Sequence, residues 1–550
     1  MPQDVPPSQP APAPPSTPRD SPSSSQPAPT QVNEPRPDVW GLPPALGPET
    51  WAGLAPPAPP APPDPSNKPE PFDPPSPPPA SHGAGWDPAP GPWTFRGCVT
   101  WALLLALVLA LAAAQQRPQS PAPSDDQDPA KIASPILQFL GRYAIGWKRL
   151  LDTPTANDPN LLALSQRLDR LALHPTDDLR LAVLQGELLG RHEALARLAP
   201  LLSTPGVPDA LQADARALLK LYQSGAAALT PEQAGDLVRR HRWFARLALV
   251  HDGPEASRSG VLRQADLVVR AMAFTAAATA CATLAGLAIL LRALARAHAG
   301  RFRWRYREPQ HRAEGKPLAW VETGILLLAA LAALQALQQR VTPGSPTASV
   351  LDAAVWCLLA VPLWPLLRGV PPRSWRLALG WHQGEGALRE IGCGIVAYIA
   401  GLPVLLLGFL ATLMLHAALG QTPLATGLAL ADAAPGAHPV IYELALASPA
   451  QAVALVLLMT AWAPLLEESV FRGALHHALR RRRGPLPAIL LTAVGFAIIH
   501  PQGLVAAPLL TALAINLGVT REWRGSLIAP ITLHALNNAL VTGVLLLAIT

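Results

Sequence analysis

The sequence contains few of the residues that build disulfide-bonded or nucleic-acid-binding proteins. Its 550 residues include four cysteines, and none of them forms a Cys-x-x-Cys motif. This argues against both a disulfide framework and a zinc–thiolate site. Charged residues account for only 15% of the chain. The net charge is +6, but the arginines gather at the ends of apolar stretches rather than among aromatic residues on a soluble face. We therefore expect no nucleic-acid partner.

Apolar residues, by contrast, make up 50% of the chain, which favours a membrane protein. We expect an all-α, polytopic membrane helical bundle in the lipid bilayer, with about nine spans, eight of them in the C-terminal bundle. The predicted spans cover residues 98–114, 268–291, 318–337, 349–367, 391–417, 449–470, 485–500, 504–519 and 526–549.

Composition also divides the chain into regions. Residues 1–96 are rich in proline and show no helical period, which predicts a disordered N-terminal tail. One transmembrane span follows in 97–115, and a small soluble all-α domain is expected in 116–265, where leucines recur at helical spacing. Within it, Thr230-Pro231-Glu232-Gln233 predicts a helix start with a capping box. The remaining spans fall in 266–380 and 381–550.

Basic residues flank alternate spans, and this pattern predicts the orientation in the membrane. Arginines are dense at 292–307, 368–376, 480–483 and 521–524, whereas the loop 418–448 has almost none. We expect the basic loops and the tail to be cytoplasmic and the 116–265 domain to lie outside. The Ala-, Leu-, Pro- and Arg-rich composition suggests a high-GC bacterium, so we expect a multi-pass protein of the cell membrane, in this case the bacterial inner membrane.

Several ionisable residues lie inside the last apolar stretches, where each charge costs at least about 2.5–3.5 kcal/mol at the bilayer centre. At about 1.5 Å per helical residue, they lie roughly 15–20 Å from the basic end of their helices, near one common depth. Such residues normally mark function. They form three patterns, which are Glu467-Glu468-x-x-x-Arg472, Phe496-x-x-x-His500 and His534-x-x-x-Asn538.

The spacing within each pattern suggests a chemical role. Glu468 and Arg472 are four residues apart, so the guanidinium can neutralise that carboxylate. Glu467 faces another direction, and a carboxylate near a histidine can act as a general base on water. His534 and Asn538 share one helix face and can stabilise an oxyanion. Water activation beside an oxyanion site describes amide hydrolysis. His476 and His477, which precede the basic run, are expected at the membrane interface.

The three ordered patterns resemble the motifs of the CPBP family, the CAAX prenyl protease and bacteriocin-processing (Abi or Rce1-like) intramembrane metalloproteases. Gly473 and Ala529-Pro530-Ile531 agree with the resemblance, which covers about 380–550 and makes 381–550 the CPBP-like catalytic membrane domain. It implies an endopeptidase acting on a membrane-anchored peptide or protein. It also implies site roles: water activation by Glu467 and His500, oxyanion binding by His534 and Asn538, and support from Glu468 and Arg472.

Two alternatives stay open from the sequence. Glu467, His500 and His534 are candidate ligands for zinc, although the His534–Asn538 pair suits an oxyanion better, so no cofactor is certain. The chain could also be a non-hydrolytic transporter or an inactive protease-like scaffold, for instance in bacteriocin immunity. A transporter does not require this ordered set of motifs, and the presence of every motif residue argues against an inactive scaffold. The absence of Gly-x-Gly-Asp and Gly-x-Ser-Gly disfavours aspartyl and rhomboid-type serine intramembrane proteases.

Overall fold

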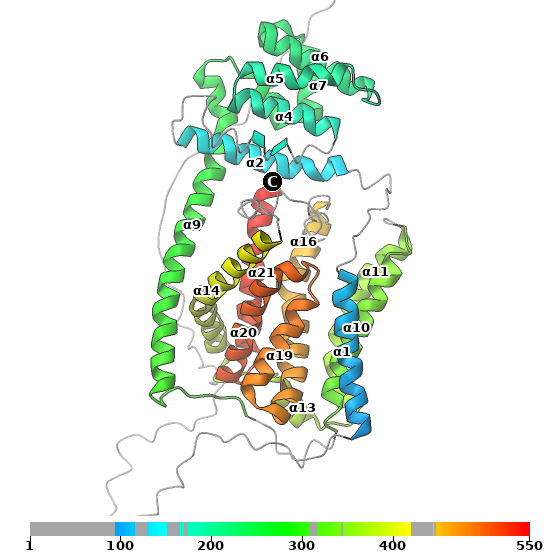
Figure 1. The fold of residues 1–550 in the computed structure, drawn as a ribbon, viewed down its shortest axis with the longest axis vertical. Helices are drawn as coiled ribbons and strands as arrows, with labels where there is room; N and C mark the ends of the chain where they lie inside the picture. Colours follow the sequence, from blue (N-terminus) through cyan, green and yellow to red (C-terminus); the bar gives the residue numbers. More distant parts are fainter. Residues whose placement is uncertain are drawn as a thin grey trace, which may run out of the picture. The chain divides into compact units, whose positions relative to one another are not determined.

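The protein is described from a computed structural model. It describes residues 94–115, 129–150, 174–307, 316–342, 345–419 and 447–549, together with 165, 166, 168, 169 and 444. Over these residues every regular element is a helix, as the sequence predicts (Figure 1). The expected N-terminal tail falls outside the described residues apart from its last three, and so does most of the loop 418–448.

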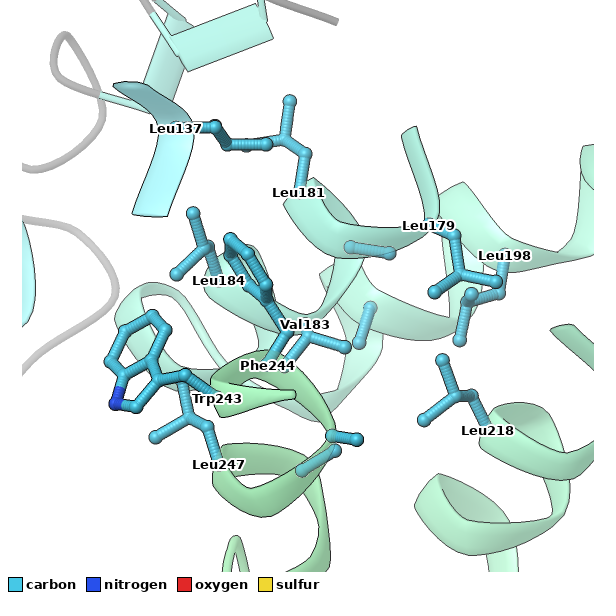
Figure 2. Packing of buried hydrophobic residues seen from close by; sticks show 14 of the residues in the cluster. Leu137, Leu179, Leu181, Val183, Leu184, Leu198, Leu218, Trp243, Phe244 and Leu247 are labelled. Atoms are coloured by element: carbon cyan, nitrogen blue, oxygen red, sulfur yellow. The ribbon is translucent and has the colours of Figure 1, made fainter. Parts of the chain in front are cut away.

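The helices before residue 265 surround a leucine-rich core of their own. Leu179, Leu184 and Leu198 pack there with Trp243 and Phe244 (Figure 2). The capping box at Thr230 is confirmed, because its hydroxyl accepts from the Gln233 amide and the Gln233 side chain accepts from the Thr230 amide. The helices of this region are α2 (Pro129–Leu150), α4 (Pro175–Leu188), α5 (Arg191–Leu198), α6 (Asp209–Ser224), α7 (Pro231–His241) and α8 (Trp243–Leu249).

Helix α9 (Glu255–His298) is 44 residues long, or about 66 Å, so it extends well beyond a hydrocarbon core of about 30 Å. Its N-terminal part contributes Leu262 and Ala265 to the leucine-rich core. Further along, it packs against α14 (Ala387–Ala418). A Cβ atom at Gly286 would collide with the Ile399 carbonyl of α14, so glycine permits this close approach. Helix α9 therefore joins the core before residue 265 to the membrane helices.

Eight helical stretches in the described residues are long and apolar enough to cross a membrane, so the chain is a polytopic helical membrane protein. The expected span at 485–500 is instead the 14-residue helix α19 (Pro485–Ile498). At about 21 Å it is shorter than the hydrocarbon core, since Pro501 and Gly503 follow its end. The eight stretches are Phe95–Ala114, Glu255–His298, Ala319–Gln338, Pro346–Leu367, Ala387–Ala418, Pro449–Arg483, Leu504–Arg524 and Ile528–Leu546.

The C-terminal helices pack together around the residues of the three motifs. Helix α20 (Ala507–Arg524) lies against α14 and α19, and α21 (Ile528–Ile549) lies against α14 and α20 (Figure 1). The stretch 449–483 consists of α16 (Pro449–Leu457), α17 (Ala463–Glu468) and α18 (His476–Arg483). Two π-helical segments separate them, η7 (Leu458–Trp462) and η8 (Ser469–Leu475). Such segments are rare and occur often at functional sites.

Candidate active site

The packing of these helices brings the three motifs together. Glu467 and Glu468 end α17, and Arg472 follows in η8. His500 lies two residues after α19, and both His534 and Asn538 belong to α21. Five of the six predicted side chains form one group, in which each lies within 4.0 Å of another member. Asn538 lies one helical turn beyond His534.

Glu467 faces both histidines. Its Oε2 atom lies 3.8 Å from Nε2 of His534 and 4.0 Å from Nε2 of His500. These separations are too long for direct hydrogen bonds, but one water molecule can bridge groups at such a distance. Oε2 is buried and makes no hydrogen bond to the described residues. The arrangement therefore presents one carboxylate oxygen and two imidazole nitrogens to a common point.

Glu468 is fully buried and holds the other side of His534. Its Oε1 atom accepts a hydrogen bond from Arg472 at 2.9 Å and lies 2.9 Å from Nδ1 of His534. The predicted pairing of Glu468 with Arg472 is thus confirmed. A carboxylate beside Nδ1 favours a proton on that nitrogen, which orients the ring so that Nε2 faces Glu467.

Arg472 is also fully buried and links η8 to two neighbouring helices. Its Nη2 atom donates to the Ala514 carbonyl of α20 at 3.2 Å. The guanidinium carbon lies 4.6 Å from the centre of the Phe496 ring on α19. A buried cation needs such partners, because removing water from it costs several kcal/mol.

His500 is held by Phe496, which lies near the end of α19. Nδ1 lies 2.6 Å from the carbonyl oxygen of Phe496, and the imidazole lies 4.1 Å from the Phe496 ring. These contacts leave Nε2 turned towards Glu467. The four-residue spacing of the Phe-x-x-x-His motif thus allows one phenylalanine to position the histidine through both its backbone and its ring.

Asn538 donates from Nδ2 to the Met459 carbonyl at 2.9 Å. Met459 lies in the π-helical segment η7, where the usual α-helical hydrogen bonds are rearranged. The Asn538 Oδ1 atom accepts from the neighbouring Asn537 at 3.2 Å. These two contacts fix which way the carboxamide points, and one Nδ2 hydrogen remains to donate to another group.

Glu467, His500 and His534, the candidate zinc ligands, are not spaced as zinc ligands are. Among the described residues, no group of three or more His, Cys, Asp and Glu side chains is arranged to hold a metal ion. Nδ1 of His534 and Nδ1 of His500 lie against Glu468 and the Phe496 carbonyl. Glu467 Oε2 stands 3.8–4.0 Å from the two remaining nitrogens, whereas tetrahedral zinc ligands at about 2.0–2.1 Å from the metal lie closer together. The residues do not fit a zinc site as arranged, and we derive no step through a metal.

Several residues that the sequence did not single out support the site. Trp381 donates to the Ser469 hydroxyl at 3.0 Å. Fully buried Arg521 donates to the carbonyls of Arg472 and Ala378, at 3.1 and 2.8 Å. Arginine near a helix end is usually read as a topology signal, so its position alone did not reveal this role.

His476 and His477 are buried, not interfacial as expected. His476 Nε2 lies 2.8 Å from Glu522, and His477 Nδ1 lies 2.8 Å from the Tyr306 hydroxyl. Tyr306 follows α9, and its backbone amide donates to the Glu522 carbonyl. The prediction failed because it ignored the segment after α9, which covers both histidines.

An open apolar groove with a volume of about 610 Å³ lies between α14, α19 and α20. It reaches Ile498, two residues before His500, and Ile515, next to the Ala514 carbonyl that Arg472 contacts. The groove is thus formed in part by α19 and α20, the two helices whose residues Phe496 and Ala514 contact Arg472. Its lining includes Val404, Leu407, Leu415, Val494, Ile498 and Ile515.

The fold is that of a polytopic helical membrane protein, and its C-terminal helices bring two glutamates, two histidines and an arginine together. Residues 449–540 match the family described as type II CAAX prenyl endopeptidase Rce1-like, so this segment is similar to that family. The matched range contains all three motifs and lies within the 380–550 range expected from the resemblance. Searches of curated proteins and of solved structures found no match.

Proposed function

We propose that the chain is an intramembrane endopeptidase in which Glu467, aided by His500, activates a water molecule to cleave a peptide bond. The main support is that Glu467 Oε2 lies within 4.0 Å of two imidazole nitrogens. A water placed among these atoms could hydrogen-bond to the carboxylate and to an imidazole at once.

The reaction can be written with these side chains alone. Glu467 takes a proton from the water while the water oxygen attacks the carbonyl carbon of the scissile bond. The carbonyl oxygen becomes an oxyanion, which accepts hydrogen bonds from Nε2–H of His534 and from the remaining Nδ2 hydrogen of Asn538. This requires a hydrogen on both ring nitrogens of His534, and the hydrogen on Nδ1 donates to Glu468. When the C–N bond breaks, Glu467 returns the proton to the leaving amine.

The open apolar groove on α14, α19 and α20 favours a substrate that comes from the bilayer. Its apolar lining offers dispersion contacts, which suit an apolar segment or a lipid anchor beside the scissile bond. We therefore propose that the substrate is a membrane-anchored peptide or protein.

The test is hydrolysis by the purified protein in liposomes. A panel of membrane-anchored peptides should yield products from one defined bond, identified by mass spectrometry, whereas protein-free liposomes should yield none. A protein that is folded but releases no product from any member of the panel would favour the transporter or scaffold alternative.

We also propose that residues 116–265 form a soluble domain on the extracytoplasmic side of a bacterial inner membrane. This rests on the arginines at 292–307, in the last turns of α9 and just after it, which favour a cytoplasmic position for that end of the helix. Reporter fusions near residues 200 and 310 should give opposite signals. The same signal at both sites would contradict this topology.

A further inference from the structure

Phe496 contacts side chains from all three motifs at once. Its ring is buried and lies 4.1 Å from the His500 ring and 5.9 Å from the His534 ring, measured between centres. The guanidinium carbon of Arg472 lies 4.6 Å from the ring centre. One phenylalanine therefore touches the side chains that flank both Glu467 and Glu468.

The contact with Arg472 has an electrostatic reason. Arg472 and Glu468 are both fully buried, and the guanidinium donates to one carboxylate oxygen and one backbone carbonyl. Its Nε atom is buried and makes no hydrogen bond to the described residues. The face of an aromatic ring carries partial negative charge and attracts a cation within about 6 Å, most strongly where water is excluded. The Phe496 ring supplies this attraction where hydrogen-bond partners are lacking.

A chain of contacts leads from this ring to the reacting atoms. Arg472 donates to Glu468 Oε1 at 2.9 Å, and the same oxygen lies 2.9 Å from Nδ1 of His534. Nε2 of that ring then lies 3.8 Å from Glu467. Displacing the guanidinium would move the carboxylate that orients His534. On the other side, His500 is fixed by the ring and the carbonyl of Phe496.

We propose that Phe496 is a positioning residue of the hydrolytic site, whose ring face holds Arg472 by a cation–π interaction and so fixes the Glu468–His534 pair. This inference rests on the proposed endopeptidase function. It assigns Phe496 an electrostatic role in addition to packing, and the two roles make different predictions.

Fluorinated phenylalanines separate the two roles because they weaken the negative face of the ring while nearly keeping its shape. Mono-, di- and trifluorophenylalanine are introduced at position 496 in the full-length protein. We expect kcat to fall stepwise, by about tenfold in total, with little change in KM. The Tm in detergent should fall in the same order.

Phe471 is the matched control. It is also buried and meets the Phe496 ring edge-on, but its centre lies 6.0 Å from the Arg472 guanidinium carbon. At 6.0 Å the attraction is much weaker, so the same substitutions at Phe471 should lower kcat much less than those at Phe496. The electrostatic role would be overturned if kcat did not change with fluorination at either position, or if it fell equally at both.

The same experiment tests the proposed endopeptidase function separately. If the wild-type protein hydrolyses no peptide, the endopeptidase function fails and the positioning role fails with it, while the Tm series still decides whether the ring holds the guanidinium. If the wild-type protein is active and kcat does not change with fluorination at position 496, only the inference about Phe496 fails.

Discussion

Nδ1 of His534 lies 2.9 Å from Oε1 of Glu468, although 66 residues separate them in the chain. This contact joins α21 to α17 and directs the opposite ring nitrogen towards Glu467. The same Glu468 oxygen accepts from Arg472, so one buried carboxylate orients the histidine and balances the arginine. Glu468 therefore has a defined task that differs from that of Glu467.

Replacing Glu468→Gln tests that task. The amide keeps the shape of the side chain but removes the charge that balances Arg472. Breaking a buried ion pair costs about 3–5 kcal/mol, so we expect a lower free energy of unfolding. We also expect kcat to fall by about 100-fold or more, with a smaller change in KM. Thermal unfolding and steady-state hydrolysis measure both.

The control for this variant is Glu322→Gln. Glu322 is partly buried and pairs with Arg368 at 2.8 Å on other helices. Its loss should lower stability modestly and leave kcat close to the wild-type value. A Glu468→Gln protein with wild-type kcat would show that the contact with His534 has no catalytic role.

Asn538→Ala removes one of the two proposed oxyanion donors. Loss of one such donor typically lowers kcat by about 10²–10³-fold, and we expect a loss of that size with KM nearly unchanged. Asn516→Ala is the matched control, because Asn516 also donates to a backbone carbonyl, that of Ala397, within the bundle. Equal kcat values for the two variants would argue against an oxyanion role for Asn538.

The sequence predicted those parts of the site that depend on spacing within one helix. The Glu468–Arg472 pair follows from a separation of four residues, and the Thr230 capping box follows from local sequence as well. The contact between Glu468 and His534 could not be derived in this way, because it depends on how α17 and α21 pack. The burial of His476 and His477 depends on tertiary packing in the same way. The end of α19 does not, because Pro501 and Gly503 follow it in the sequence.

The carboxyl group of Asp214 makes the stability of the helices before residue 265 depend on pH. Burial opposes ionisation of its carboxyl, but hydrogen bonds with His241 and Arg240 outweigh this and lower its pKa below the ordinary value. An acid whose pKa is lowered by folding stabilises the fold above its unfolded-state pKa of about 4, and this stabilisation is lost as the pH falls through the native value.

We therefore expect Asp214→Asn to lower the protection of α6 and α7 from hydrogen exchange at pH 7. The difference from wild type should shrink as the pH falls below about 4. Asp252→Asn, which alters a more exposed ion pair with Arg191, should have little effect at either pH. A difference for Asp214→Asn that is the same at both pH values would contradict the assigned charge state.

Metal removal tests the water-activation scheme from another side. The geometry around Glu467 suits a bridging water better than a zinc ion, so we expect hydrolysis to persist after exhaustive chelation. Metal analysis of the purified protein and activity before and after chelation measure this. Stoichiometric zinc, whose removal abolishes activity and whose return restores it, would require a metal-bound water instead.

The most direct test of the account is single-turnover hydrolysis by Glu467→Gln beside the wild-type protein. The amide occupies the same space near His500 and His534 but cannot take a proton from water, so the rate should fall by about 10²–10⁴-fold while Tm stays close to that of wild type. A correctly folded Glu467→Gln protein that cleaves the same bond at the wild-type rate would contradict the central claim.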